Sequence, residues 1–208
     1  MKFIAISDTH GKHEQVNLPD GDVLIHAGDI TWQGHEREVL DFLGWFANLS
    51  FRYKIFIAGN HDFYFERESS EKVKAAIPGS VIYLEDSSID IEGIRIWGSP
   101  VTPWFYDWAF NRHRGEEIRK HWEKISEHTD IVVTHGPAYG MLDQSSKGEH
   151  LGCKDLYERL AHVKPRIHVC GHIHEAYGTA EKADIKFINC SATDEKYRLI
   201  HAPVVFEL

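Results

Sequence analysis

The chain has 208 residues, 42% of them hydrophobic and 26% charged, and its formal net charge is −9. The length predicts one globular domain over residues 1–208, and the acidic balance argues against long nucleic acid as a partner, because such binding relies on a basic surface. No apolar run approaches the roughly 18 residues of a membrane span, and the run after Met1 is too short for a signal peptide, so we expect no membrane association.

Buried strands and amphipathic helices alternate in the first part of the chain. Continuous apolar runs, mostly of β-branched residues, predict strands over 2–6, 22–26 and 54–58. A stripe of apolar residues at helical spacing predicts a helix over 34–48, and a shorter helix is expected over 68–76. This order is typical of a sheet covered by helices.

The middle of the chain is expected to form three consecutive antiparallel strands. They cover 81–84, 88–91 and 94–97, with Glu92-Gly93 as the turn between the last two. Two prolines then break regular structure in 98–113, where five aromatic residues lie within 104–110. Clustered aromatic residues usually fill a core, and Trp104 or Phe105 is the alternative candidate for a wall on which a base stacks.

The last part of the chain returns to helices and strands. We expect helices over 115–125 and 154–160, and strands over 130–134, 166–170, 185–188 and 204–206. Taken together, the elements predict an α/β (α+β) fold in four layers, a sandwich of two mixed β-sheets flanked by helices. The three cysteines match no zinc-binding spacing and are odd in number, so reduced thiols and a cytoplasmic protein are expected.

Five short segments rich in metal-ligating side chains each follow a predicted buried strand. They are Asp8-Thr9-His10, Gly28-Asp29, Gly59-Asn60-His61-Asp62, Thr134-His135-Gly136 and Gly171-His172-Ile173-His174. A single buried Asp or His is usually structural, but five such segments at strand ends predict one rim where carboxylate, imidazole and amide groups meet. Hard, charged ligands collected at one place indicate a bound cation.

The predicted ligands are too many for one ion. Seven side chains qualify: Asp8, His10, Asp29, Asn60, His135, His172 and His174. Two ions that share a carboxylate would use them all. The mixture of nitrogen and oxygen donors favours Mn²⁺, with Fe²⁺, Co²⁺, Ni²⁺ and Zn²⁺ as alternatives, over Mg²⁺ or Ca²⁺. The lack of cysteine ligands argues against a structural zinc site.

The ordered motif set resembles the calcineurin-like metallophosphoesterases, from residue 4 to about residue 176. Within that superfamily the chain is most similar to the small metallophosphoesterase-domain (MPPED) group of cyclic nucleotide phosphodiesterases. The closer resemblance is carried by Trp97-Gly98-Ser99-Pro100, the segment from Pro103 to Asn111, His135-Gly136-Pro137, Gly152-Cys153, Gly171-His172-Ile173-His174-Glu175 and Tyr177-Gly178.

The resemblance implies a role for each site residue. One metal would be held by Asp8, His10 and His174, the other by Asn60, His135 and His172, and Asp29 would bridge both. A hydroxide between the metals would attack phosphorus directly. His61 would protonate the leaving oxygen, with Asp62 as the partner that orients its ring.

The implied function is a dinuclear-metal-dependent phosphodiesterase that acts on small phosphodiesters or nucleotides, such as cyclic nucleotides. Asn111, Arg112 and Trp104 are the expected substrate contacts, because Asn111 and Arg112 could reach a phosphate. A phosphomonoesterase or a nuclease for short nucleic acid is the alternative with the same site. A non-catalytic scaffold that binds a protein is the second alternative, although such proteins tend to lose the histidine at position 61. The oligomeric state stays open.

Overall fold

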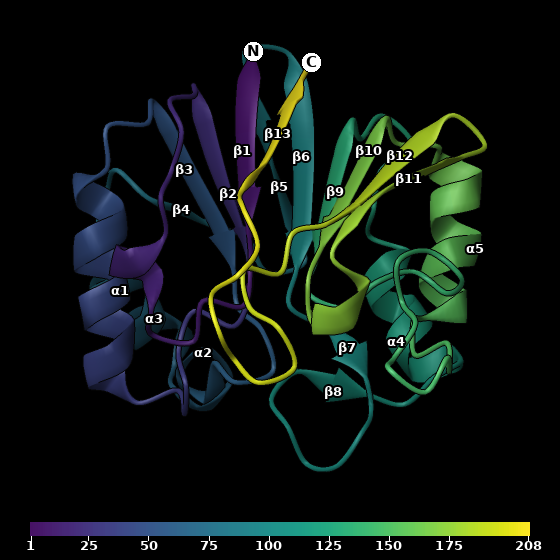
Figure 1. Cartoon of the computed structure of the whole chain (residues 1–208), viewed down its shortest axis with the longest axis horizontal. Coiled ribbons are helices and arrows are strands. Elements are labelled where there is room, and N and C mark those ends of the chain that lie inside the picture. The colour runs from purple at the N-terminus through teal and green to yellow at the C-terminus, as the bar shows by residue number, and fades with distance from the viewer.

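Two β-sheets pack face to face in the computed structural model, which describes residues 1–208, and helices cover the outer face of each sheet (Figure 1). The predicted four-layer sandwich is therefore confirmed. Alternation along the strands explains the layering, because Phe3 and Ala5 point into the core between the sheets while Ile4 and Ile6 point to the helices. Strands buried on both faces give continuous apolar runs rather than alternating ones.

The first sheet has five strands in the order β13-β1-β2-β3-β4. Their bounds are Lys2–Ile6 for β1, Val23–Ala27 for β2, Tyr53–Ile57 for β3, Ile82–Tyr83 for β4 and Val204–Glu207 for β13. Only β13 is antiparallel to its neighbour. Helices α1 (Glu36–Asn48) and α3 (Ser70–Ala76) cover its outer face through apolar contacts from Phe42, Phe46 and Val73.

The second sheet has six strands in the order β11-β12-β10-β9-β6-β5. Their bounds are Ser87–Ile91 for β5, Ile94–Ser99 for β6, Ile131–Thr134 for β9, Ile167–Cys170 for β10, Gly178–Lys182 for β11 and Ile185–Asn189 for β12. β6, β9, β10 and β12 are parallel, and the edge strands β5 and β11 are antiparallel. Helices α4 (Glu116–Trp122) and α5 (Lys154–Val163) cover its outer face.

Several short elements complete the fold: α2 (Phe63–Arg67), the two-residue strands β7 (Thr102–Pro103) and β8 (Asn111–Arg112), and 3₁₀ turns over His13–Gln15 and His174–Ala176. α2, β7 and β8 lie below the sheets in Figure 1. The strands β1, β2, β3, β9 and β10, which precede the five motifs, end on the side of the sheets that faces these three elements. The topology therefore brings segments that are distant in sequence to one rim. None of the helices combines the length and the apolar character that crossing a bilayer requires.

One strand prediction is wrong in its pairing. β4, inside the predicted strand 81–84, pairs in parallel with β3 in the first sheet and not with the next strand along the chain. After β4 the chain crosses to the second sheet, where β5 and β6 form the expected hairpin around Glu92-Gly93. A two-residue strand carries no alternation from which its partner could be inferred. The elements α2 and β11 were not predicted, because neither has a continuous or periodic apolar pattern.

Candidate active site

The seven predicted ligands lie together where the motif-bearing strands of the two sheets end. His135 Nε2 lies 3.3 Å from Asp29 Oδ2 and 2.9 Å from Asn60 Oδ1. His10 Nε2 is 3.8 Å from Asp29 Oδ2, and His174 Nε2 is 3.4 Å from Asp8 Oδ1 on the far side of the cluster. Donor atoms at these separations fit ligands that share a cation, since each would lie about 2 Å from the ion.

Strained backbone turns position these side chains in the cluster. Asp8, His10, Asp29 and His172 all adopt the left-handed conformation, with φ of 56°, 45°, 54° and 68°. Non-glycine residues rarely take this conformation, and such strain is concentrated at functional sites. The chain turns sharply after each strand, so that backbone and side chain both face the rim.

Two glycines let the backbone approach the carboxylates. A Cβ atom at Gly59 would collide with Asp29 Oδ1, and one at Gly171 would collide with Asp8 Oδ2. The His172 N–H, directly after Gly171, donates to Asp8 Oδ2 at 3.0 Å. The glycines in these motifs therefore leave room for the two carboxylates themselves.

Four histidines are oriented by the same kind of hydrogen bond. Each directs Nδ1 at a backbone carbonyl, so that Nδ1 carries a proton and Nε2 points toward the cluster. The pairs are His10 with Thr31 O at 3.3 Å, His61 with Trp32 O at 2.7 Å, His135 with Ala27 O at 2.9 Å and His174 with Asp194 O at 2.9 Å. The Nε2 atom of His10 is buried without a hydrogen-bond partner, as expected of an atom whose partner is a cation.

The buried carboxylates of the cluster need positive charge nearby to balance them. Burial acts to raise the pKa of Asp8, but the His174 imidazole outweighs it, and the pKa of Asp8 lies well below its ordinary value. Burial likewise opposes charge on His135 and His174, yet the neighbouring carboxylates raise the pKa of each imidazole to about 9. Protons on these two imidazoles thus balance the carboxylates where divalent ions would do so.

Three groupings of side chains have ligand atoms within 4.8 Å of one another. They are Asp8, His10 and His174; Asp8, Asp29 and His135; and His10, Asp29 and His61. The first is the predicted ligand set of one metal, and the second joins the predicted bridge to a ligand of the other metal. His172 belongs to no grouping, although its ring lies 5.0 Å from that of His135 and lines the adjacent pocket. The residues present therefore fit a two-ion site.

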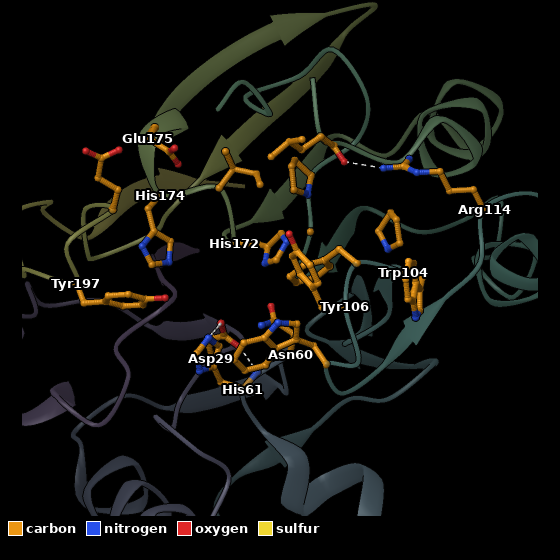
Figure 2. A pocket seen from close by; sticks show the side chains of 18 residues that line it. Asp29, Asn60, His61, Trp104, Tyr106, Arg114, His172, His174, Glu175 and Tyr197 are labelled. Atoms are coloured by element: carbon orange, nitrogen blue, oxygen red, sulfur yellow. Dashed lines mark hydrogen bonds and ion pairs between the residues drawn. The ribbon is translucent and has the colours of Figure 1, made fainter. Parts of the chain in front are cut away.

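A pocket of about 480 Å³ opens beside the cluster, with Asp29, Asn60 and His61 on its floor (Figure 2). Aromatic residues form much of its wall: Trp104, Phe105, Tyr106, Trp108 and Tyr197. Trp104 is 50% exposed and Tyr106 78% exposed, so their rings face solvent and the pocket mouth. Trp104 lines the pocket, and its contact with a substrate stays a prediction.

Asp62 does not have its predicted role. Its carboxylate accepts hydrogen bonds from the N–H groups of Ile30, Thr31 and Gly59 and from the Thr31 hydroxyl, and none from the His61 ring. The ring of His61 is oriented by the Trp32 carbonyl instead. Adjacent residues in a turn send their side chains in different directions, so proximity in sequence did not identify the partner.

Two predicted substrate contacts are also wrong. The Arg112 guanidinium donates to Glu66 Oε1 at 3.2 Å, and the Asn111 amide donates to Thr102 Oγ1 at 2.9 Å. Neither residue lines the pocket beside the cluster. Both residues belong to β8, which pairs with β7, and no sequence signal predicts that pairing.

Arg114 is the only arginine or lysine among the residues that line the pocket. Its guanidinium donates to the carbonyls of Leu151 and Gly152, at 2.8 Å and 2.7 Å (Figure 2). Sequence reasoning missed it, since nothing about its neighbours distinguishes it from Arg112. The arginine that reaches the pocket is therefore two residues beyond the predicted one.

The sequence matches the family model for calcineurin-like phosphoesterases over residues 1–176. It is 39% identical over 230 residues to human Metallophosphoesterase domain-containing protein 1, an alignment that covers 100% of this chain and 71% of the human protein. Among solved structures, Phosphopantetheinyl Hydrolase (PptH) from Mycobacterium tuberculosis is similar in fold, with a TM-score of 0.63, 15% identity and coverage of 94% of this chain and 90% of PptH. The chain therefore belongs to the calcineurin-like phosphoesterases and is a metal-dependent phosphoesterase.

Proposed function

We propose that the chain is a dinuclear-metal-dependent phosphodiesterase that hydrolyses small phosphodiesters such as cyclic nucleotides. The observation that carries the proposal is the cluster of two carboxylates, one amide and four imidazoles beside a single pocket, which Asp29, Asn60, His172 and His174 of that cluster line. The volume of that pocket, about 480 Å³, suits a ligand of nucleotide size. The net charge of −9 supports a small substrate over long nucleic acid.

Two ions complete the proposed site. Asp8, His10 and His174 would hold one, Asn60, His135 and His172 the other, with Asp29 between them. Bound there, divalent ions supply Lewis acidity toward the phosphate and a nucleophilic water at neutral pH. The mixed donors support Mn²⁺, with Fe²⁺, Co²⁺, Ni²⁺ or Zn²⁺ as other occupants.

The chain's own residues supply the proton and the substrate contacts. His61 lines the pocket with its Nε2 4.0 Å from Asp29 Oδ2, so it would donate a proton to the oxygen that leaves phosphorus. The Trp104 ring, stacked on His113 with centroids 5.6 Å apart, offers a planar face for a nucleobase. The three buried free cysteines support a reducing compartment such as the cytoplasm.

The test is hydrolysis of paired diester and monoester substrates by the purified chain with each divalent ion in turn. We expect bis-p-nitrophenyl phosphate and 2′,3′- or 3′,5′-cyclic AMP to be hydrolysed with Mn²⁺, and p-nitrophenyl phosphate far more slowly. A preference for the monoester would make the chain a phosphomonoesterase, and cleavage of short single strands alone would make it a nuclease. If the protein binds metal but hydrolyses no substrate with any ion, the result would favour the alternative of a non-catalytic scaffold that binds a protein.

A further inference from the structure

The His61 ring is confined on several sides. Its Nδ1 donates to the Trp32 carbonyl at 2.7 Å. The Trp108 ring lies over it, with centroids 4.4 Å apart and planes 33° from parallel, and the edge of His10 meets it at 4.6 Å. The hydrogen bond alone would let the imidazole tilt about its Nδ1. Of the rings around His61, that of Trp108 has the shortest centroid distance, and it covers a face of the imidazole and so restricts this tilt.

Trp108 is itself fixed to the motif that carries His61. Its indole stacks on Phe63, with centroids 5.9 Å apart and planes 27° from parallel. The N–H of Ala109, the next residue, donates to the carbonyl of Asn60 at 3.2 Å. The aromatic segment and the histidine turn therefore form one packed unit, although nearly fifty residues separate them in the chain.

We propose that Trp108 is a positioning residue, which holds the His61 imidazole with Nε2 toward the oxygen that leaves the substrate. The inference rests on the proposed function, in which His61 is the proton donor. Geometry at the proton donor is critical, because a misplacement of about 1 Å can lower a rate about 10²-fold. Trp108 would act through His61 and not on the metals, since its ring contacts are with His61 and Phe63.

The step balances as follows. The bond between phosphorus and the leaving oxygen breaks, its electron pair stays on that oxygen, and the proton on His61 Nε2 moves to the same oxygen. The imidazole is left neutral, with its Nδ1 proton still donated to Trp32. The water consumed gives hydroxide to phosphorus, and its second proton restores His61.

The test separates substrates by their need for a proton. Bis-p-nitrophenyl phosphate releases p-nitrophenolate, a stable anion that departs without a proton, whereas diphenyl phosphate releases the more basic phenolate. We expect Trp108→Leu, which keeps apolar volume but removes the planar ring, to lower kcat for diphenyl phosphate by about 10- to 100-fold. For bis-p-nitrophenyl phosphate the loss should be only a few-fold. Metal content should not change, and because Trp108 also lines the pocket, any change in KM should be the same for both substrates.

Two further variants serve as controls for that result. Trp108→Phe keeps a ring over His61 and should restore most of kcat for diphenyl phosphate. Trp104→Leu removes a tryptophan of the same segment that has no ring contact with His61, and it should affect both substrates alike, mainly through KM.

The variant His61→Ala distinguishes failure of the proposed function from failure of the role proposed for Trp108. If His61→Ala lowers both diesters equally, the proton-donor role in the proposed function is wrong. If His61→Ala acts selectively on diphenyl phosphate but Trp108→Leu does not, the role of Trp108 is overturned and the proposed function stands. Loss of bound metal or of the folded state in Trp108→Leu, with Trp108→Phe equally inactive on both substrates, would also overturn it.

Discussion

Asp29 Oδ2 lies 3.3 Å from His135 Nε2, which joins a side chain at the end of a strand in the first sheet to one at the end of a strand in the second. Both side chains are almost fully buried. A carboxylate and an imidazole so placed can bind one cation between the sheets. Asp29 also lies within 4.0 Å of the Nε2 atoms of His10 and His61, so it is the common member of the cluster.

Replacing that carboxylate should remove metal and activity together. In Asp29→Asn the charge that faces three imidazoles is lost, so we expect metal content to fall and diester hydrolysis to drop by at least about 10²-fold. Elemental analysis and turnover measure the two effects. Asp90→Asn is the matched control, because Asp90 pairs only with Arg95 at the surface. Full metal content with full activity in Asp29→Asn would contradict the site.

His61 should matter for turnover and not for metal. The ring takes part in one of the three possible ligand groupings, so the distinction needs a measurement. We expect His61→Gln to keep metal and to lose about 10² to 10⁴ in kcat, the usual effect of removing a general acid. If metal content falls in parallel with kcat, His61 is a ligand and the proton donor must be sought elsewhere.

Metal binding should be linked to pH through His135 and His174. Neighbouring carboxylates outweigh burial and raise the pKa of each imidazole to about 9, so in the metal-free chain both carry protons at neutral pH. A metal must displace those protons, and its affinity should therefore rise from about pH 6 to about pH 9. Calorimetric titration with Mn²⁺ in buffers of different ionisation enthalpy would count the protons released. Affinity independent of pH across this window would contradict the assignment.

A second pH effect concerns the stability of the fold and involves Asp86, which belongs to none of the ligand groupings. Asp86 accepts hydrogen bonds from His121 Nδ1 and Lys124 Nζ, both at 2.7 Å, and so ties the chain between β4 and β5 to α4. Burial opposes its charge, but these partners lower the pKa of Asp86 from 3.8 to about 2. Its contribution is thus fully present above its ordinary pKa and is lost as the pH falls toward the lowered value.

Asp86→Asn should therefore lower the free energy of unfolding by about 1 to 2 kcal/mol at neutral pH, after allowance for solvent screening. The difference from the parent chain should shrink as the pH falls through the interval between those two pKa values. Urea unfolding at neutral and acid pH checks both statements. An equal difference at all pH values would mean that the carboxylate charge is not the cause.

Substitutions of Arg112 and Arg114 should have different effects on substrate binding. Arg114→Gln removes the donors that hold the Leu151 and Gly152 carbonyls at the pocket wall, and we expect KM for a diester to rise by about 10-fold. Arg112→Gln breaks the pair with Glu66 and a hydrogen bond to the Asn111 carbonyl, both to residues that do not line the pocket, and should leave KM unchanged. Steady-state kinetics on both variants decides, and an equal rise in KM would show that the pocket assignment of Arg114 is wrong.

Much of the fold could be predicted from the sequence because both of its sheets are buried. Strands such as β1 and β9, apolar on both faces, stand out as continuous runs, and the motifs that follow them identify the rim. Pairing was harder to predict, as β4 shows, because a strand's partner depends on where the chain crosses between sheets. The side chains around His61 could not be predicted for the same reason, since Trp32 and Trp108 belong to turns that are distant from His61 in the sequence.

The sequence by itself determined the family, the layered fold and the seven candidate ligands, because each of these is written in short local patterns. Only the tertiary structure decided what surrounds them: which carbonyls orient the imidazoles, that Arg114 and not Arg112 reaches the pocket, and that Asp62 holds backbone turns. Such contacts join segments far apart in the chain, and their geometry follows from packing and not from the identity of neighbouring residues.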